Sequence, residues 1–325
     1  MNEKNSPQRR RGRGESAKNT NHVFFARSQR TLRLCGALLI AFSAAEAAIV
    51  ADVRAAVDRH DLALAESYVQ RYRAEHGVTP EMMEALSWLG RGALDSKNLN
   101  KAEQYAHETR DLVLKELKKR ALDAEPHLPL ALGASIEVEA KVMVARGNRS
   151  EAVQFLEKEL ALYRSTSLRT RIQKSLNSLT LEGKPAPPLA GVPLAKFKGH
   201  PVLLFFWAHW CPDCKSEVPI LARLMERYGK QGLVLIGPTR LYGYMARGEE
   251  APPAEETRYI EQVRQRYYAV LAASPVPVNE ENFKTYGAST VPTLVLLDRQ
   301  GIVRMYHPDV MPYEALAARV ETMLK

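Results

Sequence analysis

The sequence predicts an all-helical segment followed by an α/β fold in the C-terminal part of the chain. Between residues 49 and 180, apolar residues recur at three- and four-residue spacing between short polar turns, with almost no strand signal. After a proline-rich stretch at residues 181–188, short apolar runs alternate with helical stretches. Because 325 residues are enough for two ordinary domains, we expect a helical domain over 49–180, a linker over 181–188 and an α/β domain over 189–325.

The first 48 residues have the pattern of a secretory leader. A basic stretch precedes the apolar run Leu34–Ala45, and the small residues Ala45 and Ala47 flank Glu46. The run is shorter than the ~20 residues that span a bilayer. We therefore predict that residues 1–48 are a signal peptide or an N-terminal anchor and that the protein is exported.

The charge distribution argues against nucleic-acid binding. The formal net charge is +9, but residues 1–47 hold nine Lys or Arg against three Glu, a net of +6, which leaves +3 for the rest of the chain. Apolar residues make up 46% and charged residues 26%, as in a soluble globular protein.

The helical segment carries small residues at positions where two helices would meet. Each of three alanines follows another small or apolar residue by twelve positions, in the pairs Val53/Ala65, Gly90/Ala102 and Ala140/Ala152. The run Ser87–Gly90, followed by Ala102 and Tyr105, resembles the tetratricopeptide pattern, which implies stacked helix pairs with a concave protein-binding surface. An ordinary helical bundle without repeats remains the alternative. We expect Arg120–Gly133 to be an insert and Leu168–Leu181 to be a capping helix.

The C-terminal part predicts the element order of a thioredoxin core. We expect strands at Val202–Trp207 and Leu233–Gly237, helices at Pro212–Tyr228 and Glu255–Leu271, a hairpin of Thr293–Leu297 and Ile302–Tyr306 around Asp298–Gly301, and a closing helix at Pro312–Leu324. The linker, with its three prolines, should be an extended tether.

Two cysteines, Cys211 and Cys214, remain once the leader with Cys35 is removed. They stand where an apolar strand gives way to a helix, and Pro212 suits the first helical position. Unpaired N–H groups and the helix dipole favour a thiolate there, and the thiolate is the nucleophile of disulfide exchange. We expect Cys211, at an exposed tip, to attack a substrate disulfide and the more covered Cys214 to release the product.

Other readings of this region are weaker. A zinc site needs four ligands, and no second cysteine or histidine pair follows, so we predict neither a metal nor a cofactor. His209 and His307 are more typical of structural histidines than of copper ligands. Trp210 should cover the apolar edge of the site. The polar segment Arg240–Pro253, with its two tyrosines, predicts either a variable surface loop or a substrate-facing flap.

The segment Phe206–Pro219 resembles the active-site region of the TlpA/ResA-like thioredoxins. Supporting matches are Asn282–Gly287 and Val291–Thr293, and the resemblance covers Pro185–Lys325. It implies a periplasmic thiol–disulfide oxidoreductase, often tethered to the inner membrane, that acts as a reductant, frequently in cytochrome c maturation. It also implies protein substrates with disulfides or thiols and a membrane thiol protein as the electron donor.

The resemblance assigns roles to further residues by position. Pro292 matches the cis-proline beside the redox pair, and the backbone of Val291 would pair with an extended substrate. Glu217 matches a glutamate that would handle the proton of Cys214. Phe205 stands where ordinary thioredoxins carry a buried acid. Asp213 should oppose thiolate formation and make the pair more reducing.

The sequence thus predicts reversible dithiol–disulfide exchange, in the reducing direction. The alternative is an envelope adaptor in which the helical repeats bind partner proteins and the thioredoxin module is mainly structural. A partner protein on the helical segment is expected in either case.

Overall fold

The computed structural model describes residues 49–324, which belong to one compact unit. The predicted leader over residues 1–48 lies outside the described residues, so export remains a prediction. Among the described helices, none combines the length and the apolar character needed to cross a membrane.

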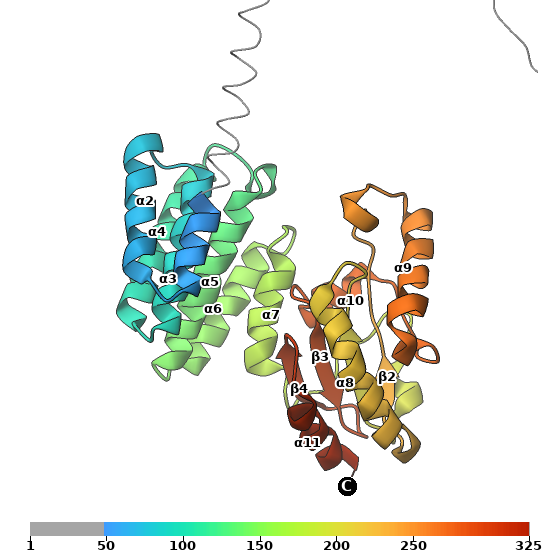
Figure 1. The fold of residues 1–325 in the computed structure, drawn as a ribbon. Helices are drawn as coiled ribbons and strands as arrows, with labels where there is room; N and C mark the ends of the chain where they lie inside the picture. Colours follow the sequence, from blue (N-terminus) through green and yellow to red (C-terminus); the bar gives the residue numbers. More distant parts are fainter. Residues whose placement is uncertain (1–48, 325) are drawn as a thin grey trace, which may run out of the picture. The chain divides into compact units, whose positions relative to one another are not determined.

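Residues 49–180 fold into helices, as the periodicity predicts. The chain is helical over 49–58, and then come α2 (Leu62–His76), α3 (Pro80–Asp95), α4 (Leu99–Glu116), α5 (His127–Ala145), α6 (Arg149–Leu162) and α7 (Arg169–Thr180) (Figure 1). Asp61, Thr79 and Asn98 cap α2, α3 and α4, because each side chain accepts a hydrogen bond from a backbone N–H in the first turn. No strand precedes residue 202 in the described part of the chain.

Small residues allow α3 and α4 to pack closely. A Cβ atom on Gly90 would lie 3.6 Å from the carbonyl oxygen of Ala102 and 3.7 Å from Cβ of Tyr105, so the two helices touch at this glycine. Ala140 of α5 and Ala152 of α6 are likewise buried. The contacts fit the predicted helix pairs, and descent from tetratricopeptide repeats remains a prediction.

The expected insert Arg120–Gly133 is wrong in its second half. The stretch between α4 and α5 runs only from residue 117 to residue 126 and contains a 3₁₀ turn at Leu122–Ala124, and α5 begins at His127. Pro129 lies in the first turn of α5, where its missing N–H removes no intrahelical hydrogen bond. Leu128 is fully buried, so this stretch belongs to the helical core.

The C-terminal part is a thioredoxin fold around a four-stranded sheet. Its elements are β1 (Val202–Phe206), α8 (Pro212–Tyr228), β2 (Val234–Ile236), α9 (Pro253–Tyr267), α10 (Glu280–Tyr286), β3 (Thr293–Leu297), β4 (Val303–Pro308) and α11 (Tyr313–Leu324) (Figure 1). The strand order is β2-β1-β3-β4, with β1 and β2 parallel and the other pairs antiparallel. The predicted strands and helices are present within a few residues, and the short helix α10 was not predicted.

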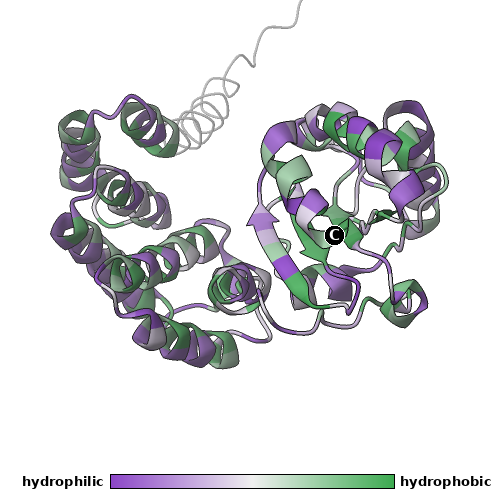
Figure 2. Cartoon of the chain, turned by 90° about the horizontal axis from the view of Figure 1, so that it is seen from below, coloured by the Kyte–Doolittle hydropathy of each residue, from purple (hydrophilic) through white to green (hydrophobic). Residues whose placement is uncertain are grey.

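Both faces of the sheet are buried, so β1 reads as a continuous apolar run. Leu203 and Phe205 point into a core shared with α8, α9 and α11, whereas Leu204 and Phe206 face α10 and the segment before β1. Figure 2 shows the corresponding alternation of hydrophobic and hydrophilic residues along the surrounding helices. The closed core fixes the end of β1, from which the cysteine segment departs.

The proline-rich linker, which the sequence predicts to be an extended tether, is hydrogen-bonded to the sheet. Gly183 donates a backbone hydrogen bond to Val303 at 2.8 Å, and Ala186 donates one to Gly301 at 2.9 Å. Leu181 is buried with Phe206 in the same core. The linker therefore covers the edge of β4, which would otherwise present unpaired backbone groups.

Helix α7 packs against α10 through Gly287. This glycine ends α10 in the left-handed conformation, at φ 64°. A Cβ atom there would lie 2.4 Å from the backbone nitrogen of Lys174, so a larger residue has no room. The close fit joins the helical segment to the loop that follows α10.

Candidate active site

The two cysteines form a disulfide at the N-terminus of α8. Cys211 is the N-cap residue, and its Sγ accepts a hydrogen bond of 3.0 Å from the backbone N–H of Cys214. Pro212 occupies the first helical position. The same N–H groups and the helix dipole would stabilise a thiolate on Cys211 after reduction.

Cys211 is more buried than the sequence suggested. Its exposed fraction is 2% and that of Cys214 is 0%, so the expected exposed tip is wrong for the disulfide form. The reason is tertiary packing: Sγ of Cys211 lies 3.5 Å from the carbonyl oxygen of Val291, which comes from a loop 80 residues away. The neighbouring Trp210 is exposed, at 44%, as are Pro212 and Asp213.

A cis peptide bond joins Val291 and Pro292 beside the disulfide. Pro292 is buried, and its carbonyl oxygen accepts a hydrogen bond of 2.9 Å from the N–H of Asp309. The loop thus brings the backbone of Val291 next to Cys211, which is where a substrate strand would have to lie to be attacked.

Glu217 lies one helical turn beyond Cys214 on the same face of α8 and is fully buried. Its Oε2 accepts a hydrogen bond of 3.3 Å from the backbone N–H of Met311, and its Oε1 has no partner among the described residues. Burial raises the pKa of Glu217 to about 7; the Met311 hydrogen bond opposes this rise and the charge of Asp309 adds to it. A carboxyl group of this kind can gain or lose a proton near neutral pH.

Asp213 lies at the surface and Phe205 lies in the core. Asp213 is exposed in the first turn of α8. Phe205 is fully buried in the core between β1 and α8, with its ring 6.3 Å from that of Tyr268. A buried acid at the Phe205 position is therefore replaced by an aromatic side chain, and Glu217 is the buried carboxyl on the helix of the cysteines.

A buried His–Glu pair next to the cysteines was missed by the sequence reasoning. His209, 2% exposed, places Nε2 3.3 Å from Oε1 of the fully buried Glu256. Burial lowers the pKa of His209, and the neighbouring Glu256 opposes this effect. Glu256 also accepts hydrogen bonds from the backbone N–H groups of Tyr242, at 2.6 Å, and Gly243, at 2.8 Å.

These contacts hold residues 240–252, here called the tyrosine loop, against the active-site segment. The rings of Tyr242, Tyr244 and Tyr259 meet the ring of His209 edge-on at 5.4–5.6 Å. Trp210 packs edge-on against Tyr242 at 5.5 Å. The loop is therefore anchored beside the active-site segment through Tyr242–Tyr244, whereas its residues 246–250 are exposed. Because His209 and Glu256 lie 47 residues apart, their pairing left no local pattern in the sequence.

One group of residues in the helical segment has ligand atoms close enough to share a metal ion. Oxygen atoms of Glu81 and Glu125 and a ring nitrogen of His127 lie within 4.8 Å of one another. Nδ1 of His127 already lies 2.6 Å from Glu84, and exposed acidic groups commonly cluster without an ion. Among the described residues, no such group of three ligand atoms includes Cys211 or Cys214.

Comparison with known proteins agrees with this site. Residues 183–239, which include both cysteines, match the AhpC/TSA family. Over 123 residues the chain is 30% identical to the thiol-disulfide oxidoreductase ResA of Bacillus thuringiensis, a match that covers 38% of this chain and 60% of that protein. Over 177 residues it is 29% identical to the thiol:disulfide interchange protein DsbE of Xylella fastidiosa, covering 51% and 80%.

Solved structures match the same part of the chain. A thiol:disulfide interchange protein of the thioredoxin family from Chlorobium tepidum is 20% identical and covers 44% of this chain and 97% of its own, with a TM-score of 0.35. The chain spans 60% of the length of the ResA relative described above. The fold and the cysteine pair define a thioredoxin-fold protein, and its homologues are thiol–disulfide oxidoreductases.

Proposed function

We propose that this protein is a thiol–disulfide oxidoreductase that exchanges the Cys211–Cys214 dithiol and disulfide with protein substrates in the cell envelope, as a reductant. One observation carries the proposal: the disulfide caps the N-terminus of α8 and lies 3.5 Å from the carbonyl oxygen of Val291, beside a cis-proline. A nucleophile and a strand-binding backbone are thus side by side.

The reaction begins from the reduced pair. The thiolate of Cys211 attacks one sulfur of a substrate disulfide, which forms a mixed disulfide and releases the other substrate sulfur as a thiol once it takes up a proton. The thiolate of Cys214 then attacks Cys211, so the substrate leaves with both sulfurs reduced and the enzyme keeps the disulfide. Two electrons and two protons from a separate dithiol protein restore the reduced pair.

Glu217 supplies a proton acceptor for the second attack. Cys214 is fully buried, so its thiol needs a nearby base before it becomes a nucleophile. Glu217 lies one turn away on α8, and its pKa of about 7 allows it to take that proton at neutral pH and to return it when the pair is reduced again.

The envelope location and the partners are inferred from several features together. The ResA and DsbE relatives match the site, and the first 48 residues have the composition of a leader. We propose a periplasmic protein that is tethered if its leader is not cleaved, a membrane thiol protein as the electron donor, and a partner or substrate on the helical segment. The three cysteines of the sequence include no second pair that would relay electrons.

A trapping experiment tests the proposal. Cys214→Ser removes the resolving sulfur and should leave substrates attached to Cys211 as mixed disulfides, visible on nonreducing gels of the envelope fraction and absent after reduction. The double variant that also carries Cys211→Ser is the matched control and should trap nothing. Equal gel patterns for the two variants would refute the exchange reaction and favour an adaptor role for the helical segment.

A further inference from the structure

Four cations surround one carboxylate on the inner helices of the helical segment. Glu137 of α5 lies 2.9 Å from Arg171, 3.2 Å from Lys174, 3.8 Å from Lys141 and 3.9 Å from Arg91. Glu137 is only 14% exposed. A single carboxylate cannot neutralise four positive charges, so the cluster holds a surplus of positive charge.

The surplus faces a hollow of about 510 Å³, here called the cationic hollow. All four cations line it, together with the two carboxylates Glu137 and Asp95, so its walls carry an excess of two positive charges. The hollow also reaches Ser289 and Thr290 of the loop after α10. It therefore extends from the helical segment to the edge of the active site.

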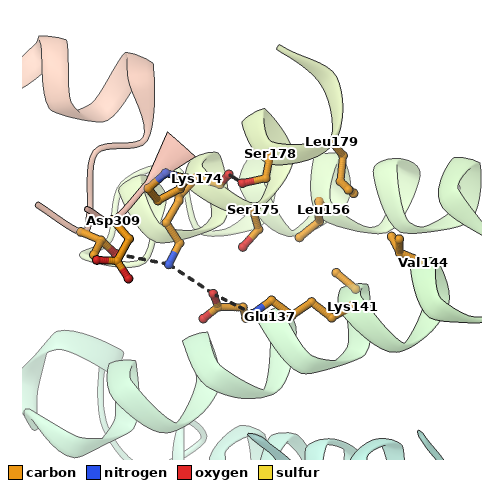
Figure 3. A pocket seen from close by; sticks show the side chains of 12 residues that line it. Glu137, Lys141, Val144, Leu156, Lys174, Ser175, Ser178, Leu179 and Asp309 are labelled. Carbon is orange, nitrogen blue, oxygen red and sulfur yellow. Dashed lines mark hydrogen bonds and ion pairs between the residues drawn. The ribbon is translucent and has the colours of Figure 1, made fainter. Parts of the chain in front are cut away.

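A second hollow of about 450 Å³ also has the Lys174–Glu137 ion pair in its wall (Figure 3). Its walls include the apolar side chains of Ala140, Val144, Leu156 and Leu179, and we call it the apolar hollow. The two hollows share the side chains of Glu137, Lys141, Lys174 and Thr290. A charged site and an apolar site are thus contiguous.

Both hollows border the loop of the active site that carries Val291 and Pro292. Nζ of Lys174 donates a hydrogen bond of 3.5 Å to Oγ1 of Thr290, and Thr290 directly precedes Val291 and the cis-proline. An extended chain advances about 3.3–3.6 Å per residue. A polypeptide held by the backbone of Val291 therefore needs only a few residues to reach the hollows.

Burial removes these cations from water, and the neighbouring carboxylates only partly offset that loss of solvation. Burial lowers the pKa of Lys174 even though Glu137 raises it, and the neighbouring Arg171 lowers it further. Burial, Arg171 and Arg54 likewise lower the pKa of Arg91, against the opposing effects of Glu137 and Glu84. A lysine beside a carboxylate ordinarily has a raised pKa, so an additional anion would be stabilised here.

We propose that the cationic hollow binds an acidic side chain of the substrate polypeptide a few residues from its reactive cysteine, with a neighbouring apolar residue in the apolar hollow. This inference rests on the proposed oxidoreductase function and names the substrate class of the same site. The adjoining apolar hollow favours a polypeptide over a free inorganic anion. Because the charged walls belong to α3, α5 and α7, the helical segment acts as the specificity element.

The test uses the reduced full chain and peptides that each carry one cysteine blocked as a thiopyridyl disulfide. A series of otherwise identical peptides places Glu or Gln at successive positions on either side of the cysteine, next to a leucine. We expect the second-order rate constant of the reduced chain with the Glu peptide to exceed that with the Gln peptide about fivefold at one or two positions, the size of an ion pair that is not fully buried. The preference should fall as the salt concentration rises.

Three variants separate the hollow from the rest of the surface. Lys174→Gln and the rim substitution Lys141→Glu should abolish the Glu preference, and Lys141 is exposed enough that its replacement leaves the core intact. The matched control is Lys158→Glu, an exposed residue of α6 outside both hollows, which should keep the preference. The control Lys158→Glu should also react with the neutral probe dithiodipyridine at the rate of the unmodified chain.

The outcomes distinguish the two proposals. Reaction with dithiodipyridine but no Glu preference at any position would overturn the hollow as a substrate site and leave the oxidoreductase function standing. A preference that survives both Lys174→Gln and Lys141→Glu would also overturn it, because the acidic residue is then read elsewhere. If inorganic phosphate protects the hollow against lysine modification while the Glu peptides gain nothing, the site binds free anions and the proposal is wrong. A chain that reduces neither probe refutes the oxidoreductase function itself.

Discussion

The substitution Glu217→Gln should change how the stability of the protein depends on pH. The pKa of the buried carboxyl is about 7, against an ordinary value of 4.5. This difference corresponds to about 3 kcal/mol of free energy between the folded and unfolded chains. Because the folded chain binds the proton more tightly, the contribution is present in full below pH 4.5, is lost as the pH rises to about 7, and stays lost above that value.

Urea denaturation of the disulfide form at a series of pH values measures this effect. Relative to Glu217→Gln, the unmodified chain should lose about 3 kcal/mol of unfolding free energy between pH 4.5 and pH 8. The matched control Glu226→Gln removes an exposed carboxylate from the same helix and should follow the unmodified chain. Parallel profiles for the unmodified chain and Glu217→Gln would show that the pKa of Glu217 is the same in the folded and unfolded chains, and its role as proton acceptor for Cys214 would then lose its physical basis.

Two further substitutions test the contacts that hold the site together. Gly287→Ala should lower the free energy of unfolding by about 2–4 kcal/mol in thermal or urea denaturation, because the added Cβ meets the backbone of Lys174 at 2.4 Å and the residue keeps a positive φ. The control Gly183→Ala, with a positive φ and open space around it, should cost only about 1 kcal/mol. Equal losses for the two variants would contradict the close fit. Glu256→Gln should lower the free energy of unfolding by about 1–3 kcal/mol, because the amide has one oxygen and leaves one of the buried N–H groups of Tyr242 and Gly243 without an acceptor. The same substitution should speed amide exchange in the tyrosine loop. Unchanged exchange there would show that the loop is held by its aromatic contacts alone.

The sequence could predict the elements whose ends carry local signals. Pro212 fixes the start of α8, and the turn after residue 297 fixes the end of β3, so both bounds were predicted closely. Helix α10 was missed because it has only seven residues and its buried face consists of Asn282, Phe283 and Tyr286. Too few positions repeat in such a helix to reveal a period.

The residues that carry the chemistry of the site lie close together in the sequence, whereas the residues that surround them come from distant parts of the chain. The Cys211–Cys214 motif and the cis-proline could be read from adjacent residues. The burial of Cys211 depends on a loop 80 residues away, and the cationic hollow depends on three helices that meet only in the folded chain. Residues such as Lys174 look like ordinary helix-surface lysines in the sequence, because spacing along one helix does not reveal what another helix brings opposite.

Asp309 is the residue at which the functional features of this molecule meet. Its backbone N–H holds the carbonyl oxygen of Pro292, its charge adds to the raised pKa of Glu217, and its side chain lines the apolar hollow beside Lys174. It has a φ of 120°, a conformation that costs a residue with a side chain about 1–3 kcal/mol and is tolerated where surrounding contacts outweigh the strain. Because one substitution at Asp309 would disturb all of these features together, a change in activity there would not identify its cause. Glu217→Gln and Lys174→Gln alter the proton acceptor and the hollow separately, and for that reason they are the variants on which the two proposals depend.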